Sequence, residues 1–409
     1  MVRSLPRWQK VYSGVHRCPV SRLSPSTSKM IQRISALDAL RGLAIIAMVL
    51  VNNPGSWQAI YAPLKHADWH GLTPTDVIFP GFIFVMGVTI AIHLPRELTR
   101  LNSSMAVVRS TTRRAISLIL LGWGLYLCWY NTGTPGYNWV EERLLSLRFA
   151  GVLPRLGVVY GLTVMLILAA SWRWVGVLAT VLLAGYWGAM EWISYADASG
   201  GIYQGRWEFG NSLAAYLDHH LLGAEHVYYS TATPFAFDPE GILSTLPAVA
   251  TCLTGVWVGR YVLVQHGCPN KLMMLALAGI CAGYGLAVIN PINKALWSPT
   301  FVLVTSGILT ILFWLSILYE RKAGPLPKGH PLLVAGTNSI AFFMLSGILA
   351  RVLLIIKIDG VSLKGHAWQF MEALPLPAEM ASLLLASVFL IICYYPIKFM
   401  YNNSFFWRI

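Results

Sequence analysis

Apolar runs of about 20 residues recur along most of this chain, and that is the length an α-helix needs to cross a bilayer. Only 11% of the 409 residues are charged and 56% are hydrophobic, whereas soluble domains carry about 25% charged residues. This excludes a disordered chain, a coiled coil and almost any water-soluble enzyme of this length. The sequence predicts an all-α, polytopic transmembrane helix bundle of about ten spans, near 36–55, 75–94, 113–130, 151–171, 173–194, 240–263, 271–290, 297–319, 331–356 and 377–399.

The basic residues lie in clusters between these runs, so the positive-inside rule predicts the orientation. With a cytoplasmic N-terminus, twenty of the 30 Lys and Arg lie in inner segments and six in outer connections. An even number of spans then places both termini in the cytoplasm. The outer connections near 56–74, 131–150 and 195–239 are rich in polar and aromatic residues. Because the last is unusually long, we expect an ordered lid there.

Residues 1–33 differ from the rest, with seven Lys/Arg and no acidic residue before Asp38. They lack the apolar core of a secretory signal. Their composition is that of a transit peptide, a basic cytoplasmic tail or an extension ahead of a start at Met30, so we expect a basic tail that is disordered or not native. Residues 34–409 are expected to form a single transmembrane domain. The net charge of +13 is too scattered to predict nucleic-acid binding.

The densest polar stretch runs from Asn52 to Asp76, between the first two spans. A histidine beside a carboxylate can be oriented and made more basic, so His66 is a candidate general base or transient acyl acceptor. Asp76 could orient that histidine. It also follows Thr73 and Thr75 at the start of a span, where it could simply cap the helix.

A zinc site is the alternative for this stretch, because His66 and His70 have the i, i+4 spacing of ligands on one helical face. Gly71 and the Thr-Pro-Thr-Asp step that follows argue against a continuous helix here. A third ligand would have to come from Asp68, His219, His220 or His226. We therefore expect no metal.

Other charges lie at the ends of spans, where they are costly and point to function. Asp38 and Arg41 share one helical face and form either a site pair or a helix-entry pair. Two arginines at the fourth span and two carboxylates at the sixth predict a buried ion pair lining a cavity, or else a solvated interfacial turn. These four are Arg148, Arg155, Asp238 and Glu240.

Two further groups have competing interpretations. Asn338 and Ser339, inside the ninth span, are either packing contacts or site residues. A basic cluster that flanks the inner connection between the second and third spans either sets topology or meets a polyphosphate ligand. It comprises Arg96, Arg100, Arg109, Arg113 and Arg114.

The sequence contains many short motifs that, taken in order along the chain, resemble those of the heparan-α-glucosaminide N-acetyltransferase family, specifically its bacterial members. The resemblance runs from about residue 31 to the C-terminus. The motifs are Arg33 to Gly42, Val51-Asn52, Lys65 to Trp69, Gly71 to Asp76, Phe79-Pro80, Gly151 to Gly157, Tyr216 to His226, Asp238 to Leu243, Asn293-Lys294, Leu296 to Ser298 and Asn338 to Ile340.

The resemblance implies a transmembrane acyltransferase domain that moves acetyl from cytoplasmic acetyl-CoA to a glucosamine-type amine across the membrane. The family's proposed catalytic histidine matches His66, and Asn52 matches an asparagine beside it. Animal members have an additional lumenal domain and span, and members carry Asn at the position of His70. A cell-envelope amino sugar or muropeptide breakdown product is the expected acceptor, rather than a glycosaminoglycan.

These considerations predict a multi-pass enzyme of the bacterial plasma membrane, with the lipid bilayer and a glycan as partners. The sequence is also compatible with a homodimer. The alternatives are a transporter or exporter of sugars or lipid-linked glycans, and a polysaccharide O-acyltransferase. The predicted catalytic residues are His66, Asn52 and Asp76. The predicted cavity residues are Arg41, Asp68, Arg155, Asp238, Glu240, Asn338 and Ser339, and the predicted acetyl-CoA-binding residues are Arg109, Arg113 and Arg114.

Overall fold

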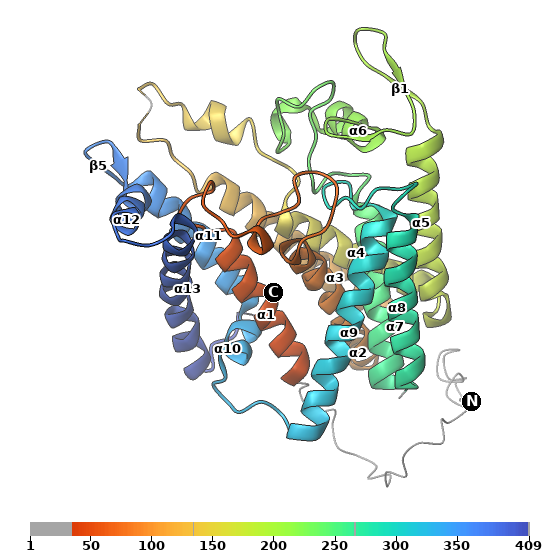
Figure 1. Ribbon diagram of the computed structural model, residues 1–409. Coiled ribbons are helices and arrows are strands. Elements are labelled where there is room, and N and C mark those ends of the chain that lie inside the picture. Colours follow the sequence, from red (N-terminus) through yellow and green to blue (C-terminus); the bar gives the residue numbers. More distant parts are fainter. Residues whose placement is uncertain (1–34, 134, 266, 408–409) are drawn as a thin grey trace, which may run out of the picture.

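The computed structural model describes residues 35–133, 135–265 and 267–407 (Figure 1), so the predicted tail at 1–33 lies outside the described residues. Each of the ten apolar runs is helical. The helices are α1 (Ser35–Val51), α2 (Ile78–Leu101), α3 (Ser104–Leu127), α4 (Val152–Ala169), α5 (Val175–Trp192), α7 (Thr245–Gly259), α8 (Pro269–Leu286), α9 (Pro299–Ala323), α10 (Pro331–Thr337) with α11 (Ser339–Ile355), and α13 (Ala378–Asn402).

Within the described ranges, 6 helical segments are long and apolar enough to cross a membrane. A seventh is added if α10 and α11, bent by 86° at Asn338, form one broken span. The expected count of ten is therefore higher than length and composition support. The physical reasons are that α1 has only 17 residues, α3 carries three arginines in its first turns, and α8 opens with Pro-Asn-Lys.

Glycines allow the central helices to approach closely. Helix α7 packs against α2, α4, α5 and α9. A Cβ atom at Gly87 would overlap the backbone of Cys252, and one at Gly255 would overlap the backbone of Phe84. Because small residues let transmembrane helices come into backbone contact, this pair of glycines explains the tight α2–α7 packing.

The expected outer connections gather at one end of the bundle, where Figure 1 shows β1, α6, β5 and α12. The segment predicted as a lid is ordered. The short elements at this end are β1 (Tyr195–Ala196) paired with β2 (Ile202–Tyr203), β3 (Trp207–Glu208) paired with β4 (Asn211–Ser212), α6 (Leu213–Leu222), η6 (Ala224–His226), the π-helical turn η4 (Val140–Leu144), β5 (Lys357–Ile358) paired with β6 (Val361–Ser362), and α12 (Leu363–Glu372).

Hydrogen bonds tie these connections to one another. The indole Nε1 of Trp69 donates to the carbonyl of Trp207 at 2.8 Å, and the amide of Phe149 donates to the carbonyl of His226 at 3.3 Å. The connection from α9 to α10 lies at the opposite end (Figure 1). The bundle therefore has one elaborated end and one simpler end.

Candidate active site

The segment that carries His66 joins α1 to α2 through two 3-10 turns, η2 (Ala62–Leu64) and η3 (Pro74–Val77). Asp76 is the third residue of η3, and its Oδ2 accepts hydrogen bonds from the amide and the hydroxyl of Thr73, at 3.1 and 3.0 Å. This is a capping box. The amide of Ala67 also donates to Oδ2, at 3.1 Å, so the carboxylate binds the histidine segment to the helix start.

The other oxygen of Asp76 faces the imidazole of His66. The distance from Oδ1 to Nδ1 is 2.6 Å, and the Asp76 side chain is 1% exposed while that of His66 is 43% exposed. Because the buried carboxylate is an acceptor, we assign the proton to Nδ1, which leaves the lone pair of Nε2 free. The capping and orienting roles considered for Asp76 are thus both present, one on each oxygen.

Lys294 completes this cluster and is absent from the predicted site. Its Nζ lies 2.9 Å from Nδ1 and 3.5 Å from Nε2 of His66, and 3.3 Å from Oδ1 of Asp76. Burial lowers the pKa of Lys294, and the Asp76 carboxylate opposes that change. A signal was present in the sequence, because Lys294 is the only charged residue in the short connection between two apolar runs.

The turn that carries Lys294 is rigidly held. The buried side chain of Asn293 donates from Nδ2 to the carbonyl of Trp69 at 2.9 Å and accepts the amide of Leu296 at 2.8 Å. The amide of Gly71 donates to the carbonyl of Ile292 at 2.8 Å. The histidine segment, just after His66, and the lysine turn, just before Lys294, are therefore bound to each other by two hydrogen bonds.

A second charged cluster joins the fourth-span and sixth-span motifs. The guanidinium of Arg148 binds both oxygens of Asp238, at 2.6 and 2.7 Å, and Glu240 at 2.5 Å. Burial raises the pKa of Glu240, although Arg148 opposes that change. The charges of Glu240 and Lys294 also interact, so this cluster neighbours the His66 cluster.

Arg155 is buried beside the second cluster but makes different contacts. Its Nη2 donates to the carbonyl of Gly241 at 3.2 Å and to the hydroxyl of Ser244, and its guanidinium lies 5.1 Å from the ring centre of Trp297. Within the described part of the chain, its Nε and Nη1 have no hydrogen-bond partner. The structure thus pairs Asp238 and Glu240 with Arg148 rather than with Arg155.

A large cavity of about 680 Å³ extends along α2, a volume within the range of small-molecule sites. It is lined on α2 from Phe82 to Glu97, and Phe82 lies six residues, or about 9 Å of helix rise, from Asp76. Its polar lining consists chiefly of Asp38, Arg41, Thr89, His93, Arg96, Glu97, Arg114, Tyr160, Thr337 and Ser339. The cavity therefore extends along α2 from Phe82, at the half of the helix that follows Asp76, to the cations at the opposite end of α2.

Three predicted residues line this cavity: Arg41, Arg114 and Ser339. Arg41 binds Asp38 and Thr89, each at 3.0 Å, and Arg114 donates to the hydroxyl of Tyr160 at 3.3 Å. Arg96 and His93 also line the cavity although they are not in the predicted site. Arg96 belongs to the basic cluster noted in the sequence, whereas His93 carried no signal beyond its place in an apolar run.

Other predicted residues do not line the cavity, and within the described ranges none of them hydrogen-bonds to either cluster. Asn52 and Asp68 are exposed, and neither side chain hydrogen-bonds to a described residue. Arg109 and Arg113 are exposed on α3 and do not line the cavity. Asn338 is buried and binds the C-terminal segment through the carbonyl of Phe405 and the amide of Trp407, both at 3.0 Å, which is the packing role.

No group of three or more His, Cys, Asp and Glu in the described ranges could hold a metal ion. The two members of the hypothetical zinc pair have separate partners. His66 binds Asp76, and Nδ1 of His70 lies 3.4 Å from Nδ2 of Asn293.

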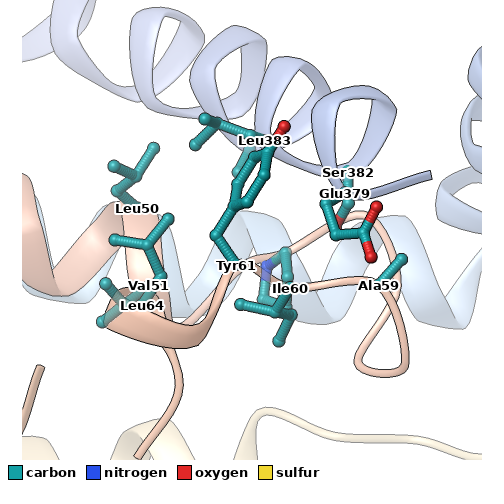
Figure 2. Close-up of a pocket in the computed structure, with 11 residues that line it drawn as sticks. Leu50, Val51, Ala59, Ile60, Tyr61, Leu64, Glu379, Ser382 and Leu383 are labelled. Carbon is teal, nitrogen blue, oxygen red and sulfur yellow. The ribbon is translucent and has the colours of Figure 1, made fainter. Parts of the chain in front are cut away.

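A seam with α13 fixes the first half of the histidine segment. The amide of Ser56 donates to the hydroxyl of Ser382 at 3.1 Å, and the amide of Gly55 donates to its carbonyl at 3.3 Å. Figure 2 shows the small pocket beside this seam, with Tyr61 and Glu379 in its lining. Its volume of about 20 Å³ accommodates one water molecule, so we regard it as a packing gap.

Comparison with known proteins shows the family of this chain. Residues 33–285 match the family described as "Heparan-alpha-glucosaminide N-acetyltransferase, catalytic". Proteins named heparan-alpha-glucosaminide N-acetyltransferase from Homo sapiens and Mus musculus are each 28% identical, over 359 and 362 residues. These alignments cover 76% of this chain and 52% and 53% of the relatives. The chain thus spans about half the length of the curated relatives it matches.

Proposed function

Because the chain belongs to the heparan-α-glucosaminide N-acetyltransferase catalytic family and is a multi-pass integral membrane protein, we propose that it is a membrane acetyltransferase. The acetyl group would come from cytoplasmic acetyl-CoA. The acceptor would be the amine of a glucosamine-type sugar of the cell envelope, at the opposite end of the bundle. The predicted bacterial plasma membrane is the location consistent with that acceptor.

One observation carries this proposal: the half-exposed imidazole of His66 is held by the buried carboxylate of Asp76 at 2.6 Å. This leaves Nε2 available to remove a proton from an acceptor amine or to accept the acetyl group itself. A positioned general base contributes about 10²–10⁴-fold to a rate. The geometry suits either route.

The cavity along α2 supports acetyl-CoA as the donor. Arg41, Arg96 and Arg114 supply cations for its phosphates at the end remote from His66. The other end of the cavity is lined by Phe82, near the start of α2. A long, flexible donor bound with its phosphates at the basic end would extend its acetyl group toward His66.

This orientation also agrees with the uneven distribution of Lys and Arg along the sequence. The basic end of the cavity would face the cytoplasm, where acetyl-CoA is available and where positive residues concentrate. The end that carries α6, β1 and α12 would face outward and receive the sugar.

Acetyl transfer can be tested with purified protein, labelled acetyl-CoA and glucosamine. We expect His66→Ala to lower transfer by at least about 10²-fold, because it removes the positioned base. His70→Asn is the matched control, since His70 is a nearby histidine outside the cluster, and it should retain near-wild-type transfer.

Near-wild-type transfer by a folded His66→Ala protein would contradict the proposal. Sugar transport by the wild type into vesicles without acetyl-CoA would favour the transporter alternative. An ester-linked product would favour an O-acyltransferase.

A further inference from the structure

The ammonium group of Lys294 lies beside the imidazole of His66 and not in line with its Nδ1–H bond. An atom that lies in the ring plane along the Nδ1–H bond would be much farther from Nε2 than from Nδ1. The Nζ atom of Lys294 is 3.5 Å from Nε2 and 2.9 Å from Nδ1, so the two distances are similar. The in-plane position belongs to Asp76, at 2.6 Å. Lys294 therefore does not compete with Asp76 for the Nδ1 proton.

The ammonium group of Lys294 has more N–H donors than its contact with Asp76 uses. It carries three N–H bonds, and its one carboxylate contact with a described residue is with Oδ1 of Asp76 at 3.3 Å. Its side chain is 27% exposed, so a bound substrate can reach it. Of the residues that the structure describes, Lys294 alone places a side-chain donor within 3.5 Å of Nε2, and because Nζ lies beside the ring it leaves the Nε2 lone pair free.

The fold determines the position of the Lys294 Nζ atom through the turn that carries this residue. Asn293, the neighbouring residue, is fully buried and binds the carbonyl of Trp69 in the histidine segment. Lys294 is thus presented by a short, tightly bonded turn rather than by a mobile loop. A catalytic donor needs this kind of preorganisation, because it must already point at the charge that develops.

We infer that Lys294 is a catalytic residue whose ammonium group stabilises the oxyanion formed when the thioester carbonyl is attacked beside His66. This inference rests on the proposed acetyltransferase function. It goes beyond that function by assigning the electrophilic partner of the reaction.

The step balances without a further reactant. The neutral acceptor amine adds to the carbonyl carbon of acetyl-CoA, and Nε2 of His66 takes the proton that the nitrogen loses. The carbonyl oxygen becomes an oxyanion next to Nζ. Collapse of this intermediate breaks the carbon–sulfur bond, the leaving thiolate takes the proton from Nε2, and the products are the acetamide and the CoA thiol. If Nε2 itself attacks the carbonyl, the oxyanion forms beside the same ammonium group.

The experiment compares Lys294→Met, which keeps the length of the side chain but removes its charge, with Lys294→Arg. Single-turnover acetyl transfer and equilibrium binding of acetyl-CoA are measured on the same preparations. Loss of one oxyanion donor typically lowers the rate by about 10²–10³-fold. We expect that loss in Lys294→Met with acetyl-CoA affinity unchanged, and a smaller loss in Lys294→Arg.

Chemical rescue separates charge from structure. Ethylammonium should restore part of the transfer rate of Lys294→Ala, whereas uncharged propanol should not. Lys364→Met is the matched control, because Lys364 is a half-buried lysine on α12, and its transfer rate should remain close to wild type. If Lys294→Met does not fold, as judged by its thermal melt, Lys294→Gln replaces it under the same criterion.

A folded Lys294→Met protein with a transfer rate within about threefold of wild type would overturn this inference. So would equal rescue by ethylammonium and propanol, which would indicate a merely structural role. Failure of the proposed function looks different, because the wild type itself would then transfer no acetyl group.

Discussion

Asp76 contacts His66 with one carboxylate oxygen and its own helix start with the other. Oδ1 lies 2.6 Å from Nδ1 of His66, while Oδ2 accepts the amides of Thr73 and Ala67. The position of the imidazole is thus coupled to η3, the turn that leads directly into α2. The same helix forms one wall of the cavity, so a single carboxylate links the proposed base to the proposed donor site.

Asp76→Asn should lower the rate of acetyl transfer by about two orders of magnitude, because an amide can donate to Nδ1 and favour the wrong imidazole tautomer. The KM for acetyl-CoA should change little. Steady-state kinetics measure both parameters. A large rise in KM with an unchanged kcat would show that Asp76 acts in donor binding instead.

Arg114→Met should weaken acetyl-CoA binding roughly tenfold or more, because it removes a charged donor that lines the cavity. Arg109→Met is the control, since Arg109 lies five residues away on the same helix but is exposed and outside the cavity. Equilibrium binding of labelled acetyl-CoA measures the effect. If both substitutions weakened acetyl-CoA binding equally, the overall positive charge of the protein, and not the cavity, would account for the attraction of the donor.

Asp218 should make stability depend on pH. Burial raises its pKa to about 7 from an ordinary value of 3.8, although the amides of Ile242 and Asp238 favour the charged form. Folding therefore takes up a proton between these values. The stabilising contribution is complete below about pH 4 and is lost as the pH rises through about 7.

We accordingly expect the melting temperature in detergent to fall between about pH 5 and pH 8, and Asp218→Asn to reduce that slope. Asp197→Asn is the control. Hydrogen bonds from Ser199, Tyr203 and Gly201 hold the pKa of the partly exposed Asp197 at about 2, so it does not titrate in this interval. An unchanged slope in Asp218→Asn would contradict the assignment.

Gly55→Ala should disturb the histidine segment from a distance. An added Cβ would lie 2.8 Å from the Trp368 ring and 2.9 Å from Cα of Ser382, so the seam with α13 must open. We expect a lower melting temperature and slower acetyl transfer. Gly185→Ala in α5 is the control, because its Cβ would meet nothing within 4 Å and alanine favours a helix. Normal transfer in Gly55→Ala would show that the seam does not position His66.

Hydropathy predicted where helices form but not how many of them qualify as spans. Each apolar run is helical because its residues bury their apolar faces and satisfy their own backbone hydrogen bonds. Interruptions were harder to foresee. The ninth run bends by 86° at Asn338, where the Asn338 side chain binds the C-terminal segment, a contact between distant positions that no local pattern encodes.

The site was predictable where its parts lie close together in the sequence. His66 and Asp76 are ten residues apart, and a histidine followed by a capping carboxylate is a local pattern. Lys294 reaches the same imidazole from 228 residues away, through the turn between α8 and α9. The basic cluster was identified as a group, but only the rotation of α2 and α3 in the bundle determines that Arg96 and Arg114 line the cavity while Arg109 and Arg113 do not.

The central claim is that an acetyl group passes from the cavity end of the bundle to an acceptor at the His66 end. The most direct measurement uses vesicles that contain the protein in one orientation, with labelled acetyl-CoA on the side of Arg96 and Arg114 and glucosamine enclosed on the side of His66. We predict labelled N-acetylglucosamine on the His66 side in the wild type and at least about 10²-fold less in His66→Ala. Labelled product that forms only when donor and acceptor share one side, or equally in His66→Ala, would contradict the claim.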